Sequence, residues 1–409
     1  MTTLTQATKV FAKIGCLSFG GPAAQIALMH SELVERHQWL SEKQFLSGLS
    51  FCMLLPGPEA MQLATYAGWR MHGVRGGLIA GGLFVLPGAL VIFALATLYA
   101  LFGSLDVAQS LFIGIKAAVL AVVIQALTKV AKKAFKTPLQ WGLAACSFVA
   151  LFVFNLPFPL VIAVAAGIGF FATKAQGGTA SPLVPLGQTI KTVAFWLALW
   201  LVPIAVLDLV LGQAFLSQIA TFFATLAAVT FGGAYAVLAY MAQEVVQNYG
   251  WLTAGQMIDS LGLAETTPGP LILVTQFVGF MAGFAEAGLG MAFVAGLITL
   301  WVTFIPCFLW IFAAAPYVEW ISAQPRLSGA LTAITATVVG VIANLSLWFA
   351  LHVLFNDVSR TAFGWVPSLS SLNWLALGLS LLSCLLVLRF NWNILWVLAL
   401  SAGLAVVLA

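Results

Sequence analysis

Charged side chains are scarce in this sequence. Asp, Glu, Lys and Arg together make up 7% of its 409 residues, whereas hydrophobic residues make up 62%. A soluble globular domain contains about 25% charged residues, and a chain of this size could not cover its surface with so few. The composition therefore excludes a soluble globular protein and indicates that a lipid bilayer surrounds most of the chain.

Motifs for metals, nucleotides and catalysis are also missing. The five cysteines lie apart in apolar stretches without a C-x-x-C pair, and the four histidines are dispersed, so we expect no metal site. A P-loop sequence is absent, and no cofactor is expected. A membrane-embedded enzyme would need a carboxylate or histidine cluster in polar loops, which are too short here, so we expect no enzyme. Residues 1–8 carry no charged n-region or cleavage site, and we expect no cleaved signal peptide.

Long apolar runs recur along the whole chain. A helix that spans a bilayer needs about 20 mostly apolar residues, and about thirteen runs meet or nearly meet that length. They do not alternate as the strands of an outer-membrane barrel would. We therefore expect an all-α polytopic membrane protein. The expected segments lie near residues 11–30, 45–70, 78–102, 107–128, 138–155, 158–173, 193–211, 221–242, 257–283, 288–313, 328–355, 373–389 and 392–409.

The sequence contains an internal duplication. When the chain is shifted by 212 residues, 17 of 48 positions between residues 11 and 58 are identical without a gap. The matches include Pro56-Gly57-Pro58 with Pro268-Gly269-Pro270. Shared apolar composition alone would not align two such motifs, together with a Trp and a Gln, in one register. We therefore divide the membrane domain into two homologous halves, residues 1–211 and 212–409.

The basic residues indicate how the two halves are oriented. Lys and Arg gather at cytoplasmic ends of membrane segments, and in the first half they cluster at 129–136 and 174–191. The corresponding ends of the second half have almost none, and Arg326 and Arg389 lie at the opposite ends of their segments. We therefore expect the second half to begin outside and to have the inverted topology.

The first two segments, 11–30 and 45–70, allow two interpretations. Each could cross the membrane, or each could be a re-entrant hairpin bent at its glycines and prolines. The breaks near mid-segment favour hairpins, but acidic residues in the loop between the segments dilute the charge argument. The later topology is the same in both cases.

The breaks are the predicted substrate site. Proline and paired glycines interrupt a helix, and broken backbone at membrane depth is tolerated where protein or a watery cavity satisfies it. A helix that begins at Glu59 or Leu271 would direct its unpaired N–H groups at an anion in the break. The motifs could instead only kink helices for packing. The candidate substrate-binding residues are Gly20, Gly21, Pro22, Pro56, Gly57, Pro58, Gln62, Lys116, Gly232, Gly233, Thr266, Thr267, Pro268, Gly269 and Pro270.

Ionisable residues inside membrane segments are costly and suggest function. Lys116 could supply positive charge to a cavity or could extend to the membrane interface. Glu59 and Glu265 flank the P-G-P motifs and are candidates for proton coupling, although a carboxylate at a helix start can also serve only the helix dipole. The gating candidates, which lie just past the first segment of each half, are Glu32, Arg36 and Glu244.

These motifs resemble the chromate ion transporter family in its long, two-domain form. The similar features are Phe19-Gly20-Gly21-Pro22, Trp39-Leu40, Phe45, Pro56-Gly57-Pro58, Gly73, Gly76-Gly77, Phe231-Gly232-Gly233 and Pro268-Gly269-Pro270, which cover essentially the whole chain. One departure is Ala234, which stands where the first half has Pro22.

The resemblance implies a secondary active transporter that exports chromate from the cytoplasm and confers chromate resistance, with sulfate as a close analogue. A carrier for a different small anion and an anion channel stay open as alternatives. The expected location is the bacterial inner membrane, with many passes. The expected partners are the oxyanion and the lipid bilayer, with a homodimer as an open question and no nucleic acid.

Overall fold

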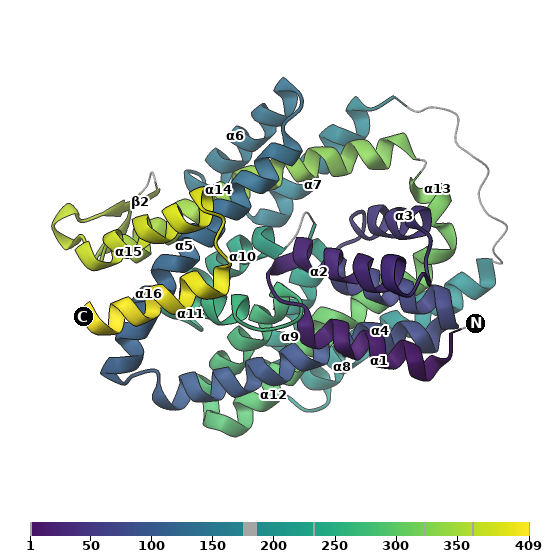
Figure 1. The fold of residues 1–409 in the computed structure, drawn as a ribbon, viewed down its shortest axis with the longest axis horizontal. Coiled ribbons are helices and arrows are strands. Elements are labelled where there is room, and N and C mark those ends of the chain that lie inside the picture. The colour runs from purple at the N-terminus through teal and green to yellow at the C-terminus, as the bar shows by residue number, and fades with distance from the viewer. Residues whose placement is uncertain (1, 175–185, 232–233, 323, 362–363, 409) are drawn as a thin grey trace. The chain divides into compact units, whose positions relative to one another are not determined.

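The computed structural model describes the chain except for residues 1, 175–185, 232–233, 323, 362–363 and 409, and helices dominate it (Figure 1). Within the described residues, five helical stretches are long and apolar enough to cross a bilayer, and shorter apolar helices accompany them. The predicted multi-pass, helical class of membrane protein is therefore confirmed.

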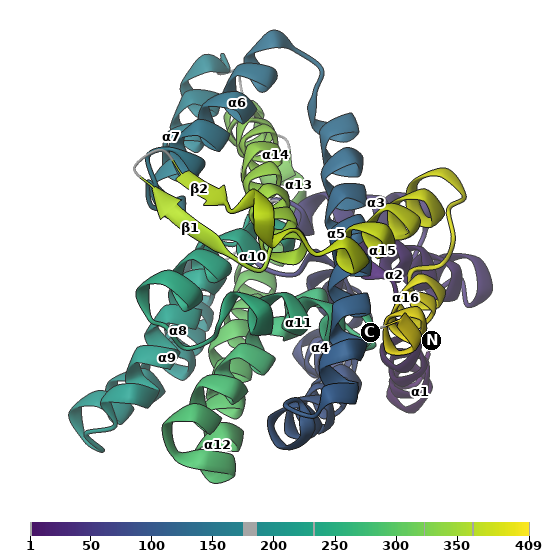
Figure 2. The ribbon, with the colours of Figure 1, turned by 90° about the vertical axis from the view of Figure 1, so that its left-hand side faces the viewer.

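The elements follow one another along the chain with short connections. The α-helices are α1 (Leu4–Leu17), α2 (Gly21–His30), α3 (Glu42–Cys52), α4 (Glu59–Phe102), α5 (Asp106–Ala134), α6 (Pro138–Phe152), α7 (Phe158–Ala172), α8 (Leu186–Leu209), α9 (Ala214–Val229), α10 (Ala234–Gln243), α11 (Ala254–Glu265), α12 (Val274–Ala314), α13 (Val318–Ser322), α14 (Pro325–Leu354), α15 (Trp374–Cys384) and α16 (Ile394–Leu408). Two short antiparallel strands, β1 (Val358–Thr361) and β2 (Gly364–Pro367), form a hairpin between α14 and α15 that the sequence analysis did not predict (Figure 2).

The contacts divide the chain into two compact units. The first contains Met1–Ala96, Lys174–Ala234 and Thr267–Ser328, and the second contains Thr97–Thr173, Tyr235–Thr266 and Gly329–Ala409. In the first unit α12 packs against α8 and α9, and α3 packs against α13. In the second unit α5 packs against α11, α15 and α16. Each unit therefore combines segments from both halves of the sequence.

The segments 11–30 and 45–70 both fold back on themselves. In the first, Lys13 on α1 donates to Glu32, just beyond α2, over 2.6 Å, so the two arms run side by side. In the second, the ring of Tyr66 on α4 lies against Gly48 on α3 and leaves no room for a Cβ there. Both segments are helical hairpins whose tips are the glycine and proline motifs, which is the geometry of the re-entrant alternative.

Two of the longest helices are in fact bent pairs. Helix α4 has non-helical backbone at His72 and Gly73, where Gly73 has a φ of +62°, and Gly68 packs directly against Gly76. The chain therefore reverses after residue 71, and 74–102 forms a separate helix. Helix α12 reverses in the same way at Gly288, with a φ of +76°. A positive φ allows such a tight turn, and glycine adopts it without a Cβ clash.

Local structures recur at the spacing of the duplication. Ser41 and Gln44 form a capping box at the start of α3, and Thr253 and Gln256 form one at the start of α11. A π-helical turn precedes each of them, η1 (Ser31–Arg36) and η2 (Glu244–Asn248). The sequence identity between residues 11 and 58 and their counterparts thus corresponds to matching backbone structure.

Candidate functional site

The glycine motif of each half contacts the P-G-P motif of the other half. The N–H of Gly57 donates to the carbonyl of Thr230 over 2.8 Å, and the N–H of Gly269 donates to the carbonyl of Ser18 over 2.8 Å. Ser18 and Thr230 are 212 residues apart, as are Gly57 and Gly269. The two hydrogen bonds are therefore equivalent and reciprocal, and all four residues belong to the first unit.

The P-G-P sequence explains the shape of these loops. Gly57 has a φ of +116° and Gly269 one of +88°, a backbone region that residues with a Cβ rarely adopt. Helix α4 begins at Glu59, and a single 3₁₀ turn, η3 (Leu271–Leu273), leads into α12. Helices therefore start at both predicted positions, directly after the second proline of each motif.

Buried glutamine amides hold the two loops. Gln62 donates to the Pro56 carbonyl over 2.6 Å, and Gln25 donates to the Gly269 carbonyl over 2.7 Å. Both side chains are buried, and neither amide oxygen has a hydrogen-bond partner among the described residues. The sequence analysis proposed Gln62 but missed Gln25. The available signal was position, because Gln25 and Gln62 each follow a Pro22 or Pro58 break by about one helical turn.

The glycine motif of the first half begins α2. Gly20 is its exposed N-cap, with a φ of +85°, and Gly21 and Pro22 form its half-buried first turn. Their counterparts Gly232 and Gly233 lie outside the described residues.

The threonines before the second P-G-P motif differ from the predicted anion donors. Thr266 donates its hydroxyl to the Leu263 carbonyl over 2.7 Å at the end of α11, and Thr267 is buried. The Thr266 hydroxyl thus caps its own helix in this structure, which is the structural alternative for such residues.

Lys116 pairs with a carboxylate that the sequence analysis did not select. Its ammonium lies 3.5 Å from Asp259 on α11, and Asp259 also accepts the Tyr99 hydroxyl over 2.9 Å. All three residues belong to the second unit. The signal for Asp259 was its charge within an apolar segment, which applies equally to the residues that were selected.

The two proton-coupling candidates have different surroundings. Glu59 is the half-buried first residue of α4, at the positive end of the helix dipole. Glu265 is buried at the end of α11 and accepts the Tyr235 hydroxyl over 2.7 Å. Only Glu265 is therefore held within a buried hydrogen bond to a second titratable side chain.

The gating candidates form matching contacts in the two halves. Glu32 is buried beside Lys13, at 2.6 Å, and Arg36, at 3.3 Å. The hydrogen bond from Lys13 holds the pKa of Glu32 below its ordinary value. At the equivalent position, Glu244 accepts the Asn248 amide over 2.8 Å. The first half thus has a cationic cluster where the second has a neutral amide.

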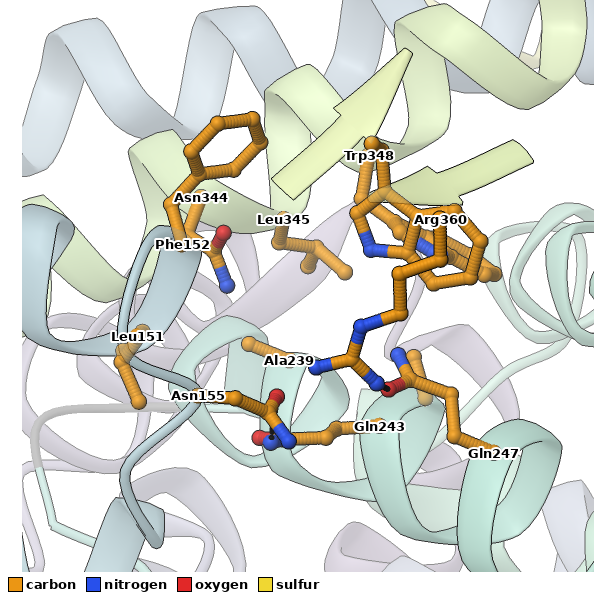
Figure 3. A pocket seen from close by; sticks show the side chains of 12 residues that line it. Leu151, Phe152, Asn155, Ala239, Gln243, Gln247, Asn344, Leu345, Trp348 and Arg360 are labelled. Carbon is orange, nitrogen blue, oxygen red and sulfur yellow. Dashed lines mark hydrogen bonds between the residues drawn. The ribbon is translucent and has the colours of Figure 1, made fainter. Parts of the chain in front are cut away.

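A separate polar cavity lies in the second unit (Figure 3). Arg360 on β1 donates to Gln247 over 2.7 Å and lies over the Trp365 ring, 5.7 Å from its centre. Asn155 and Gln243 line the same space. The cavity has a volume of about 20 Å³, which is room for about one water molecule. An oxyanion does not fit there in this structure.

Comparisons with known proteins agree with this arrangement. The family model described as chromate transporter matches residues 5–170 and 217–407, which is most of both halves. The chain belongs to the chromate transporter family. No solved structure matches it.

Relatives with assigned names cover nearly the whole chain. A chromate transport protein of Pseudomonas aeruginosa is 31% identical over 97% of this chain and 90% of its own length. One from Cupriavidus metallidurans is 33% identical over 83% of this chain and 81% of its own length. A probable chromate transport protein of Synechococcus elongatus is 30% identical over 90% of each chain. The chain is therefore a multi-pass membrane transport protein of a family associated with chromate.

Proposed function

We propose that this protein is a secondary active carrier that exports chromate from the cytoplasm, with sulfate as an analogue, and thereby confers chromate resistance. The reciprocal contact between the breaks of the two halves carries the proposal, because broken helices in matching positions of two repeats are the usual site of a carrier. The names of the relatives support the substrate. A carrier for another small anion and an anion channel are the alternatives.

Counterflow of labelled chromate in proteoliposomes distinguishes these functions. A carrier loaded with unlabelled chromate on one side accumulates labelled chromate transiently, since both compete for one alternating site. A channel only equilibrates the label. Accumulation driven by another anion but not by chromate would support the alternative substrate.

The proposal includes an inverted second half within the inner membrane. The topology expected from the basic residues places Gln247 outside, if residues 221–242 form a hairpin, and it places Arg360 outside as well. The hydrogen bond between these two side chains supports that arrangement. On the cytoplasmic side the same topology expects Thr189 and Tyr317, whose hydroxyls lie 2.8 Å apart.

Single cysteines test the topology directly. We expect a cysteine at Lys132 to be labelled only from the cytoplasm and one at Ala214 only from outside. Labelling of both from the same side would end the inverted-repeat proposal. Neither position lies in the proposed site, so transport by both variants can serve as a control for correct folding.

The site itself is proposed to form at the two P-G-P loops, with the start of α4 directed at the anion. The first loop, Pro56-Gly57-Pro58, is half-buried, and the adjoining Gly20 is exposed. Backbone N–H groups at a helix start and the helix dipole attract an anion without a buried counter-charge. In this proposal Gln62 and Gln25 fix the loop geometry and do not themselves bind the anion.

The membrane potential alone can drive the proposed export. Moving one charge across 100 mV is worth about 2.3 kcal/mol, so a dianion at roughly 100 mV gains about 4–5 kcal/mol, or some three decades of concentration. Proton coupling through Glu59 or Glu265 would alter this drive. The variant Glu59→Gln with Glu265→Gln, measured at fixed potential with and without a pH gradient, tests that role. If the double variant responds to the gradient as the parent does, these carboxylates do not carry the proton.

A further inference from the structure

A buried carboxylate in the second unit has an incomplete set of partners. Asp259 on α11 is 4% exposed. Its Oδ2 accepts the Tyr99 hydroxyl over 2.9 Å and lies 3.5 Å from the Lys116 ammonium. No described group lies within hydrogen-bonding distance of its buried Oδ1. An ionised carboxylate therefore has one oxygen with two partners and one oxygen with none.

Lys116 connects this carboxylate to the surroundings. Its side chain is 25% exposed, whereas that of Asp259 is 5% exposed. Gly255, at the start of α11, leaves room for the ammonium, because a Cβ there would lie 3.2 Å from Nζ. The lysine can therefore contact water, or a solute, on one side and Asp259 on the other.

Few other titratable groups face Asp259. Helix α5 contributes Lys116, α4 contributes Tyr99, and α16 carries no titratable side chain. On α11 itself, Glu265 lies six positions further on and is bonded to Tyr235. Lys116 is thus the cation that balances Asp259 among the described residues, at the distance of an ion pair.

A proton on Asp259 changes what Lys116 can do. With Asp259 ionised, the ammonium is held and its charge is largely compensated. With Asp259 neutral, the buried unpaired oxygen no longer carries charge, which removes the largest cost of its burial. The ammonium then has no counter-charge within the pair and attracts an anion.

We propose that Lys116 is a proton-gated contact for the transported oxyanion and that Asp259 is its gate. This inference rests on the proposed function and names a group that responds to protons within it. The coupling has one sign: a proton on Asp259 favours an anion at Lys116, and by linkage the anion favours the proton equally. The position equivalent to Asp259 in the first half is Ser47, so the duplicated part of the sequence supplies one such gate per chain.

Equilibrium binding of chromate to the purified full-length protein tests this without depending on transport. The parent is expected to bind chromate roughly tenfold more tightly at about pH 5.5 than at about pH 8, within the range usual for coupled sites. Asp259→Asn should bind tightly at both pH values, because Lys116 is permanently released. Chromate takes up a proton in this range too, but that contribution is the same for parent and variant, so their difference isolates Asp259.

Variants of the lysine and of an exposed aspartate complete the experiment. Lys116→Met should weaken binding at low pH to the parent's level at high pH, and Lys116→Arg should restore a pH-dependent affinity. Asp208→Asn, an exposed carboxylate near the end of α8, should behave as the parent does. The proposal is overturned if Asp259→Asn keeps the parent's full pH dependence, or if Lys116→Met binds as the parent does at low pH.

The two proposals can fail separately. Chromate binding with the expected pH dependence but without chromate flux would overturn the carrier function and leave the gate standing. Flux together with an unchanged pH dependence in Asp259→Asn would overturn the gate and leave the carrier standing.

Discussion

The two P-G-P loops share a backbone arrangement but differ in exposure and in neighbouring side chains. Each loop donates its glycine N–H to the glycine motif of the other half over 2.8 Å. Pro56-Gly57-Pro58 is half-buried, whereas Pro268-Gly269-Pro270 is buried. The first loop adjoins Glu59 at a helix start, and the second follows Glu265, which is bonded to Tyr235.

This difference separates what the duplication preserves from what it does not. Hydrogen bonds, caps and turns recur at an interval of 212 residues, because they depend on glycine, proline and polar caps that both halves retain. Charges do not recur: Asp259 corresponds to Ser47, and Arg36 corresponds to Asn248. The shared backbone is suited to a site used from both sides, and one exposed loop beside one buried loop is what a carrier with alternating access shows in a single state.

The largest expected effect comes from filling either loop. Gly57→Leu and Gly269→Leu should each lower chromate flux by at least about 100-fold, because a side chain at these positive φ values displaces the loop. A Cβ at Gly57 would lie 2.9 Å from Gln62, and one at Gly269 would lie 3.2 Å from the Phe84 carbonyl. Flux in proteoliposomes, with the amount of inserted protein measured separately, checks this.

A matched control separates strain from crowding. Gly73 also has a positive φ, of +62°, but a Cβ there has no neighbour within 4 Å. Gly73→Leu should therefore keep more flux than either loop variant. Equal loss in all three would show that the backbone conformation alone matters, and normal flux in both loop variants would place the site elsewhere.

A smaller effect is expected from the amides that hold the loops. Gln62→Met and Gln25→Met each remove a buried hydrogen bond to a loop carbonyl, which should cost about 1–2 kcal/mol of stability. Gln276→Met removes a comparable bond, to the Ala89 carbonyl, over 2.9 Å. Thermal unfolding should therefore shift similarly in all three, whereas chromate flux should fall only in the first two. A similar fall for Gln276→Met would reduce the glutamines to a general packing role.

The smallest effect is expected at the mouth of the first hairpin. Arg36 is 60% exposed in its side chain, so Arg36→Asn, which copies the second half, should change stability by about 1 kcal/mol or less. Lys13→Met should cost more, because Lys13 holds the pKa of the buried Glu32 below its ordinary value. That stabilisation is present at neutral pH and is lost as the pH falls through the lowered pKa. Unfolding of the two variants at neutral and acid pH checks the order, and a larger loss for Arg36→Asn would reverse it.

The sequence predicted the local features of this fold well. Proline and glycine punctuation located the breaks, and the register of the duplication located both helix starts, since these depend on neighbouring residues. It could not decide that segments 11–30 and 45–70 fold back, because the deciding contacts, such as Gly48 with Tyr66, join separate helices.

The missed features depend on distant parts of the chain. Gly57 and Thr230 are bonded although they belong to different halves, and Lys116 and Asp259 are paired from helices far apart in sequence. An apolar pattern predicts that a polar residue is unusual, but it does not predict which partner it finds. Gln25 escaped notice for the same reason.

Chromate flux driven by membrane potential alone tests the central claim most directly. Proteoliposomes that contain the parent protein, at equal pH on both sides and without a sodium gradient, should expel chromate from the negative compartment when a potential is imposed. The flux should reverse with the sign of the potential and disappear in Gly57→Leu. Chromate movement that is absent in the parent under every imposed potential, or that persists unchanged in Gly57→Leu, would contradict the account.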